Sequence, residues 1–179
     1  MRLPVSALLL AAAIAARAQP PAPAPVPAPA CSGARAQALD FWVGRWRVVD
    51  AKDGRLLGSN TIDKVLKGCA LIENWREPDG GEGKSFFWFD ARTQLWHQLW
   101  VEDDTRPVGG IKEKLMVSEP GAHAVRFQGT LLTPDDRVLL DRTTLEPLGD
   151  GRVRQTIEVS KDGGVSWRVG FDAVYVREP

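Results

Sequence analysis

Turn-forming residues interrupt this sequence so often that they leave room for little except short β-strands. From about residue 40 onward, clusters of glycine, proline and aspartate alternate with short apolar segments, and no apolar period of 3.6 residues lasts long enough for a helix. The segments between the turns carry β-branched and aromatic residues, which favour strands. We therefore expect ten strands, at residues 42–50, 56–66, 69–76, 84–90, 94–102, 108–117, 123–132, 137–146, 152–160 and 166–177.

Ten strands with short connections favour an all-β fold, an up-and-down antiparallel β-barrel. Closing the sheet removes the exposed edges that would otherwise promote aggregation. A two-sheet β-sandwich is the alternative, since closure of the hydrogen-bonded ladder leaves no mark in a sequence. In both cases residues 39–179 form a single domain that is long enough to bury a core.

Two segments precede this domain. Residues 1–18 combine a basic start, an apolar run and an Ala-Arg-Ala cleavage site, which is the pattern of a secretory signal peptide. The apolar run is shorter than the roughly 20 residues that span a bilayer, so we expect no membrane span. Residues 19–38 are rich in proline and alanine, which predicts a semi-rigid tether. We expect an exported protein, either periplasmic or secreted.

The sequence has two cysteines, Cys31 and Cys69. In an exported chain an even number of cysteines predicts a disulfide, and closing this loop contributes about 4 kcal/mol in the chain-entropy model. A lipoprotein would instead acylate Cys31, but residues 28–30 lack the large aliphatic residue that such sites use. Two thiols without a nearby histidine make a poor zinc site, so we expect no metal and no cofactor.

Charge excludes one class of partner. The 23 basic and 23 acidic residues are interspersed along the chain, and loss of Arg2 and Arg17 with the signal peptide leaves a net charge near −2. Sequence-independent binding of nucleic acid needs a basic surface. We therefore expect no nucleic-acid partner, and the sequence indicates no particular oligomeric state.

The register of the aromatic residues predicts which strand faces point inward. Trp96, Gln98 and Trp100 share one face of their strand, and Glu73 shares a face with Trp75, because side chains alternate. Large aromatic side chains bury most of their area, so these faces are expected to point inward. In the last strand the corresponding face carries Trp167, Val169, Phe171, Ala173, Tyr175 and Arg177.

Polar residues lie between these tryptophans, which suggests a lumen with polar groups inside. A mostly apolar lumen with a few convergent polar groups is typical of a small-molecule pocket. The alternative is a filled barrel, in which the polar groups satisfy one another or bind buried water. The candidate ligand-binding residues are Trp46, Asn60, Glu73, Trp75, Ser85, Trp96, Gln98, Trp100 and Arg142.

The opposite face of the strand at 94–102 is also apolar. It carries Leu95, His97, Leu99 and Val101. Either the register of this strand is reversed, or the exterior of the barrel meets another surface there.

The domain opens with the segment FWVGRW, residues 41–46. A Gly-x-Trp motif at the start of the first strand resembles the opening of lipocalin-like and fatty-acid-binding-protein-like barrels, in which the tryptophan plugs one end. In such barrels an arginine of a late strand stacks over this tryptophan in a cation–π contact. The resemblance assigns these roles to Trp46 and Arg177.

Residues 160–167 match S-x-D-x-G-x-x-W, the Asp-box turn of sialidases and other exported β-proteins. Asp162 can accept N–H groups across the turn, Gly163 and Gly164 allow positive φ, and Trp167 packs beneath. One copy in a domain of this length cannot form a sialidase propeller. The motif therefore predicts a structural hairpin and not an activity.

No arrangement of residues reaches a catalytic signature. His97 and His123 lie on different expected strands, and the sequence has no G-x-S-x-G nucleophile motif. Haem-binding barrels of the nitrobindin type resemble this chain in size, but they use a histidine near the C-terminus and none follows His123. Glu73 is a candidate general acid or base, because enclosure by tryptophans would raise its pKa.

The whole chain resembles a family of exported bacterial domains of unknown function with a calycin-like barrel. The resemblance implies this fold for nearly the whole mature domain and carries no activity with it. The matching segments are FWVGRWRV (41–48), LGSNTI (57–62), GCALIENW (68–75), GKSFFWFD (83–90), LWHQLWVED (95–103), DGRVRQ (150–155) and SKDGGVSW (160–167).

We expect the barrel to bind a small, partly apolar molecule in its lumen. The first alternative is a non-enzymatic interaction protein of the cell envelope, with a filled barrel and a partner docked on the outer face around Leu95, Leu99 and Val101. The second alternative is an enzyme that uses Glu73.

Overall fold

The computed structural model describes residues 31–103, 111–119, 121–133 and 135–178. The expected signal peptide and the proline-rich residues 20–30 lie outside the described residues. Two short 3-10 turns are present, η1 (Asp40–Trp42) and η2 (Leu66–Gly68). The strands are β1 (Gly44–Asp50), β2 (Leu56–Val65), β3 (Ala70–Arg76), β4 (Glu82–Asp90), β5 (Leu95–Glu102), β6 (Ile111–Met116), β7 (Val125–Leu132), β8 (Val138–Pro147), β9 (Val153–Ser160) and β10 (Arg168–Arg177).

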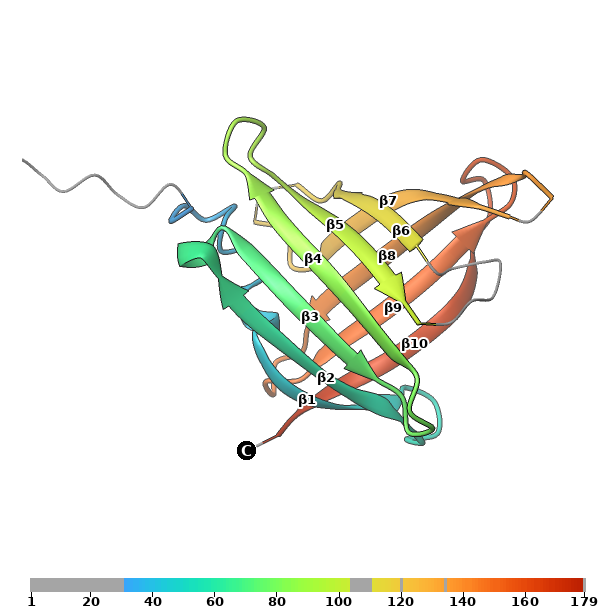
Figure 1. Ribbon diagram of the computed structural model, residues 1–179, viewed down its shortest axis with the longest axis horizontal. Coiled ribbons are helices and arrows are strands. Elements are labelled where there is room, and N and C mark those ends of the chain that lie inside the picture. The colour runs from blue at the N-terminus through green and yellow to red at the C-terminus, as the bar shows by residue number, and fades with distance from the viewer. Residues whose placement is uncertain (1–30, 104–110, 120, 134, 179) are drawn as a thin grey trace, which may run out of the picture.

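These ten strands form a closed antiparallel barrel in which each strand pairs with its neighbours in sequence (Figure 1). The barrel closes where β1 pairs with β10, from Trp46 opposite Arg177 to Asp50 opposite Ala173. The predicted up-and-down barrel is confirmed, and the two-sheet sandwich is wrong. All ten expected strands are present, with ends that differ by a few residues.

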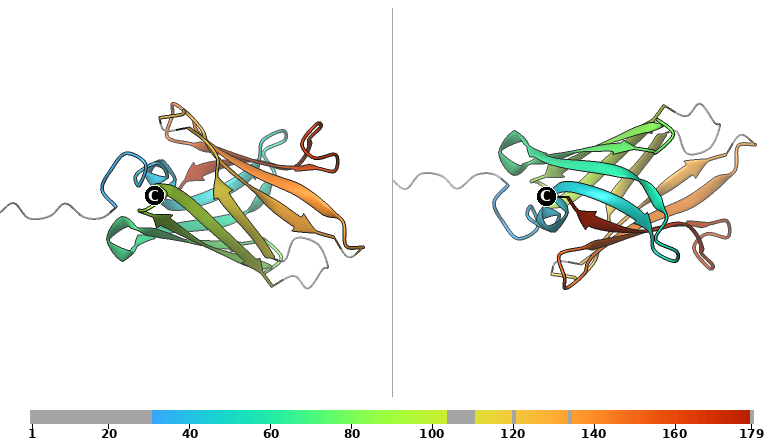
Figure 2. Two further views of the ribbon diagram at one scale, coloured as in Figure 1. Left: turned by 90° about the horizontal axis from the view of Figure 1, so that it is seen from above. Right: turned by 90° about the horizontal axis from the view of Figure 1, so that it is seen from below.

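One end of the barrel is closed by the segment that leads into β1. Leu39 and Trp42 of this segment are fully buried, and Trp46 donates its indole N–H to the Trp42 carbonyl at 2.8 Å. The Arg177 guanidinium lies 4.4 Å from the centre of the Trp46 ring, so the predicted plug and stacking arginine are confirmed. In Figure 2 the folded N-terminal segment (blue) lies at this end, and the hairpins spread apart toward the other.

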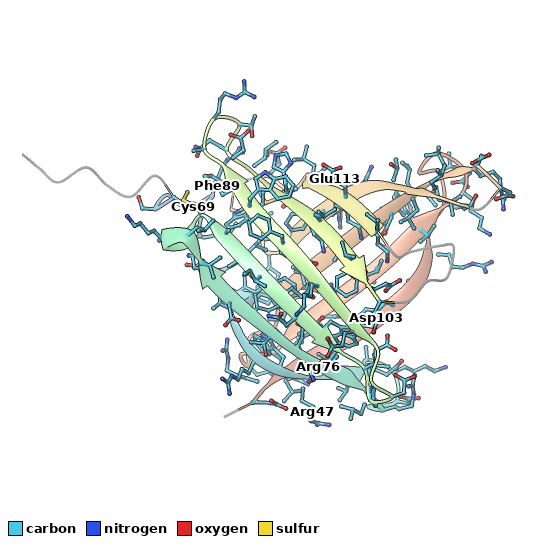
Figure 3. The ribbon with its side chains drawn as sticks, in the orientation of Figure 1. Arg47, Cys69, Arg76, Phe89, Asp103 and Glu113 are labelled. Carbon is cyan, nitrogen blue, oxygen red and sulfur yellow. A yellow bond between two sulfur atoms is a disulfide. The ribbon has the colours of Figure 1, made fainter. Side chains whose placement is uncertain are left out.

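A disulfide joins Cys31 to Cys69, as predicted. It fixes the N-terminal segment to the closed end, where the Phe89 amide donates to the Cys69 carbonyl at 2.9 Å. Figure 3 shows Cys69 and Phe89 at one end of the barrel and Arg76 and Asp103 at the other. Ala36, which the sequence places in the tether, is 1% exposed, so the folded part of the chain includes residues of the expected tether. Among the described residues, no helix is long and apolar enough to cross a membrane.

The last strand departs from the predicted register. The pairing of β10 with β9 shifts between Val169 and Phe171, as in a β-bulge, which reverses the side-chain alternation at that point. Phe171, Ala173 and Tyr175 therefore point inward as expected, whereas Val169 is 53% exposed. The prediction that Trp167 and Val169 share the inward face is wrong for this reason.

The Asp-box turn between β9 and β10 has the predicted structure. Asp162 accepts the backbone N–H of Ser166 at 2.9 Å and the hydroxyl of Ser160 at 2.7 Å. Gly163 and Gly164 have positive φ, and the Trp167 indole N–H donates to the Gly164 carbonyl at 3.0 Å. The Ser166 hydroxyl also donates to Asp162. Together these hydrogen bonds lower the pKa of Asp162 to about 2, and the bond from the Ser166 hydroxyl has the largest effect.

Candidate ligand-binding site

The inward side chains of the barrel lie at three levels along its axis. The level nearest the closed end is apolar, because each strand in turn places an apolar side chain there. These residues are buried and pack into one core with Trp42 and Tyr175. They are Trp46, Ile62, Leu71, Phe87, Trp96, Met116, Phe127, Leu145 and Val153.

The middle level is a belt of buried polar residues that runs around the barrel. Strand pairing sets Glu73 directly beside Ser85, and Gln98 directly beside Lys114. We call this set the polar belt. Its members are Asn60, Glu73, Ser85, Gln98, Lys114, Asp141, Thr143, Gln155 and Tyr175.

Glu73 is the most highly connected carboxylate of the polar belt. Its Oε1 accepts the amide of Asn60 at 2.7 Å, and its Oε2 accepts the hydroxyl of Ser85 at 2.6 Å. Ser85 in turn accepts the amide N–H of Gln98 at 3.1 Å. This direction of donation fixes the Gln98 amide, whose Oε1 is buried and has no hydrogen-bond partner among the described residues. The polar belt thus contains a buried acceptor oxygen that has no hydrogen bond among the described residues.

Tyr175 continues the polar belt on the other side of Asn60. The Asn60 amide donates to the Tyr175 hydroxyl at 3.3 Å, and that hydroxyl donates to Gln155 Oε1 at 2.5 Å. Both Tyr175 and Gln155 also line the cavity described below. The hydrogen-bonded chain therefore extends from β5 through β4, β3, β2 and β10 to β9.

A buried ion pair completes the polar belt. Lys114 donates to Asp141 Oδ1 at 2.8 Å and to the Thr143 hydroxyl at 2.7 Å. Its side chain reaches β8 by crossing Gly129, which lies between Lys114 and Asp141 in the strand register. A Cβ on Gly129 would overlap the Glu113 carbonyl and lie 3.1 Å from the Lys114 Cγ. The absence of a side chain at Gly129 thus allows this pair to form.

Above the polar belt, the open half of the barrel contains a cavity of about 400 Å³. Trp75, Trp100 and Phe171 form aromatic walls, with the rings of Trp75 and Phe171 edge to face at 6.2 Å. Glu73, Gln98 and Tyr175 of the belt form the floor. The other lining residues are Glu77, Glu102, Lys112, Lys114, Thr143, Gln155, Ile157, Val159 and Gly170.

Two glycines leave room for the wall tryptophans. A Cβ on Gly58 would lie 2.7 Å from the Trp75 ring, and a Cβ on Gly83 would overlap the Trp100 ring. Both indoles can therefore lie against the barrel wall instead of across the lumen. This packing keeps the centre of the open half free.

The rim of the cavity is acidic. Glu77 and Glu102 line both the main cavity and a neighbouring hollow of about 310 Å³, which also includes Asp79, Glu82 and Asp103. Glu102 accepts the indole N–H of Trp100 at 3.3 Å, which ties one wall residue to the rim.

Burial shifts the pKa values of three members of the polar belt. Loss of hydration raises the pKa of Glu73, and this effect outweighs the hydrogen bonds from Ser85 and Asn60 and the charge of Lys114. Loss of hydration also lowers the pKa of Lys114, which Asp141 partly offsets. The pKa of Tyr175 is raised well above its usual value by burial and by the charge of Glu73. The floor thus favours uncharged forms of Glu73 and Tyr175.

Of the nine predicted site residues, six lie at or directly beneath the cavity, two lie in the closed end, and one lies outside the lumen. Glu73, Trp75, Gln98 and Trp100 line the cavity, and Asn60 and Ser85 bind Glu73 directly beneath it. Trp46 and Trp96 lie instead in the apolar closed end, where the Trp96 indole donates to the Arg35 carbonyl at 2.9 Å.

Arg142 is outside the lumen, so its predicted role there is wrong. Asp141 and Thr143 on either side of it point inward, and alternation turns Arg142 to the outer face of β8. There it binds Glu158 through two hydrogen bonds of 2.6 and 3.0 Å and lies 3.9 Å from the centre of the Trp167 ring.

Sequence reasoning missed several polar residues of the cavity, two lysines among them. Lys112 and Lys114 alternate with outward residues in the segment IKEKLM, so the period of two could have found them. Gln155 alternates in the same way with outward residues in β9. Tyr175 was expected to point inward but was not assigned to the site.

The outer face of β5 keeps the predicted register and is partly exposed. Leu99 and Val101 are 38% and 45% exposed, and Phe86 on the neighbouring β4 is 41% exposed. Trp88 stacks on His97 with ring centres 4.7 Å apart. The inward assignment of Trp96, Gln98 and Trp100 is thus confirmed, and the apolar residues opposite them lie on the outside of the barrel.

Comparisons of the chain with protein-family models and with curated proteins find no match. The fold and the geometry of the cavity therefore carry the functional argument.

Proposed function

We propose that this protein binds a small, partly apolar molecule in the open half of its barrel. The observation that carries the proposal is the cavity of about 400 Å³, which has aromatic walls and a hydrogen-bonding floor. Ligand pockets are typically about 300–1,000 Å³ and combine apolar walls with a few polar groups. A filled barrel would have side chains in this space.

The ligand packs its apolar part against Trp75, Trp100 and Phe171. Its polar groups face the floor that Glu73, Gln98 and Tyr175 form. The belt beneath is already hydrogen-bonded, so it presents its groups in fixed positions.

The protein performs this function outside the cytoplasm, in the periplasm or beyond the cell. The Cys31–Cys69 disulfide supports this location, since disulfides persist in oxidising compartments. The signal-peptide pattern of residues 1–18 supports it as well. Membership in the exported family of calycin-like barrels stays a prediction.

The test is retention of a ligand from an extract of envelope metabolites. The purified mature protein is mixed with the extract, separated from free compounds and analysed by mass spectrometry. A variant that fills the cavity, Ile157→Phe, is compared with Ile72→Phe, because Ile157 lines the cavity and Ile72 faces outward on β3.

The wild-type protein and Ile72→Phe are expected to retain the same compound, and Ile157→Phe is expected to lose it. Retention that Ile157→Phe leaves unchanged would place the binding site elsewhere. No retention by any of the three proteins would contradict the proposal.

Catalysis by Glu73 is a second candidate function. Its support is the raised pKa of a carboxyl that lines the cavity, because catalytic acids are often tuned in this way. Any compound turned over by the wild-type protein is to be tested with Glu73→Gln. Turnover that this variant leaves unchanged would remove the idea.

A further inference from the structure

Two lysines of β6 face the cavity from the same wall. Lys112 and Lys114 are two residues apart, so both point inward, and both line the cavity. The side chain of Lys114 is 2% exposed and that of Lys112 is 20% exposed. The proposed function so far gives this pair of cations no role.

The two ammonium groups share a single carboxylate. Lys114 binds Asp141 Oδ1 at 2.8 Å, whereas Lys112 lies 3.9 Å from Oδ2 of the same residue. No other ion pair to Lys112 is present among the described residues. The charge of Lys112 also lowers the pKa of Lys114, which reflects the repulsion between them. This wall therefore carries one positive charge in excess.

The other carboxylates of the cavity have their own partners or lie at its rim. Both oxygens of Glu73 accept hydrogen bonds from Asn60 and Ser85, and among the described residues neither makes an ion pair with Lys112. Glu77 and Glu102 lie at the rim, nearer the open end than Lys112, and water screens their charge there. The cavity is thus acidic at its rim and cationic on one inner wall.

We infer that the ligand carries a carboxylate that binds between Lys112 and Lys114, attached to an aromatic or other apolar body. A monoanion matches the excess of one charge, and among the described residues Lys114 uses two of its three N–H donors on protein atoms. The apolar body lies against Trp100, which is the direct partner of Lys112 across β5 and β6. This inference rests on the proposed function and adds the chemical class of the ligand.

The test uses three naphthalene compounds whose polar head groups differ in charge. These probes are 1-naphthylacetate, 1-naphthylacetamide and 1-naphthylethylamine, which at pH 7 are anionic, neutral and cationic. Binding to the mature protein is measured by isothermal titration calorimetry at low ionic strength. We expect the acetate to bind about tenfold or more tightly than the amide, since hydrogen bonds between charged groups exceed neutral ones, and the amine to bind most weakly.

Matched variants assign the preference to this wall. Lys112→Gln removes the charge without breaking the Lys114–Asp141 pair, and it should reduce the affinity for the acetate to that for the amide. Lys112→Arg should restore the preference. Lys84→Gln is the control, because Lys84 lies exposed on the outer face of β4 and binds Asn74.

The outcomes bear differently on the two proposals. Equal binding of all three compounds, or preference for the amine, would overturn the carboxylate and leave the lumen as a ligand site. A preference for the acetate that Lys112→Gln does not change would also overturn the inference. Binding of none of the three compounds would count against this lumen as a site for aromatic ligands and therefore against both proposals.

Discussion

The two halves of this barrel use the same residue types for different purposes. Trp46 and Trp96 at the closed end are fully buried, and their indole N–H groups donate to backbone carbonyls. Trp75 and Trp100 at the open end are half-buried and line a cavity. The Trp100 indole donates to a rim carboxylate instead of to the backbone. Of these four tryptophans, the two whose N–H is bound by backbone belong to the core, and the two set against a glycine border the cavity.

The polar belt separates these two halves. On its closed side lies the apolar core, and on its open side the same hydrogen-bonded groups form the floor of a pocket. Stability and binding are therefore expected to respond to different substitutions. Each prediction below tests this division.

The largest difference is expected between Trp46→Ala and Trp75→Ala. Removing a fully buried tryptophan from a packed core costs about 3–5 kcal/mol, because a cavity remains. Removing the half-buried Trp75 should cost less than about 2 kcal/mol but weaken ligand binding. Urea denaturation measures the free energy of unfolding. An equal loss of unfolding free energy in the two variants would show that the closed end contributes no more to stability than the open end does.

The buried ion pair should behave as part of the fold. Lys114→Met leaves the buried Asp141 charged with only Lys112, 3.9 Å away, to offset it among the described residues, and breaking a buried pair typically costs about 3–5 kcal/mol. The double variant Lys114→Met with Asp141→Leu removes both charges and should recover most of this loss. A double-mutant cycle by urea denaturation measures the coupling, and additive losses would contradict the pairing.

Glu73 should make stability depend on pH. Its pKa is higher in the folded than in the unfolded protein, so the folded state binds more protons above pH 4.5. The contribution of Glu73 to stability is therefore full below pH 4.5 and is lost as the pH rises through its folded pKa. Glu73→Gln should abolish this decline and be the more stable protein at neutral pH.

Unfolding free energies from pH 4.5 to 8 test this prediction for the wild-type protein, Glu73→Gln and the rim control Glu77→Gln. The Asp162 carboxyl does not interfere, because its lowered pKa of about 2 moves its effect below pH 3.8. Parallel curves for the wild-type protein and Glu73→Gln would contradict the assignment.

The smallest effect is expected outside the lumen. Arg142→Ala removes a partly exposed pair with Glu158 and the stacking on Trp167, which together should contribute at most about 1 kcal/mol. Ligand binding should stay unchanged. A loss of binding in this variant would show that the outer face of β8 takes part in the site.

The sequence predicted the barrel because its strands are local and their turns are explicit. It also predicted Glu73 and Gln98 on the inward face, since alternation along one strand needs no knowledge of the partner strand. The level of a residue along the barrel axis depends on register between strands, and this is why Trp46 and Trp96 were assigned to the ligand. The shift between Val169 and Phe171 could not be predicted, because a bulge is set by pairing with β9.

Arg142 and Lys114 both show that contacts between strands cannot be predicted from one strand alone. The sequence analysis expects Arg142 in the lumen, but its neighbours Asp141 and Thr143 take the inward positions. Lys114 is absent from the candidates, and the partner that allows its burial lies two strands away across Gly129. Contacts of this range depend on the closed barrel and not on any local pattern.

The most direct test of the division is the response of the seven indole N–H groups to a bound ligand. Each tryptophan gives one indole signal in a ¹H–¹⁵N correlation spectrum, and 1-naphthylacetate or a retained compound is added to saturation. The signals of Trp75 and Trp100 are predicted to move most, while those of Trp46 and Trp96 stay in place. The largest shift at Trp88 on the outer face, or at Trp46 and Trp96 in the closed end, would contradict a ligand site in the open half of the barrel.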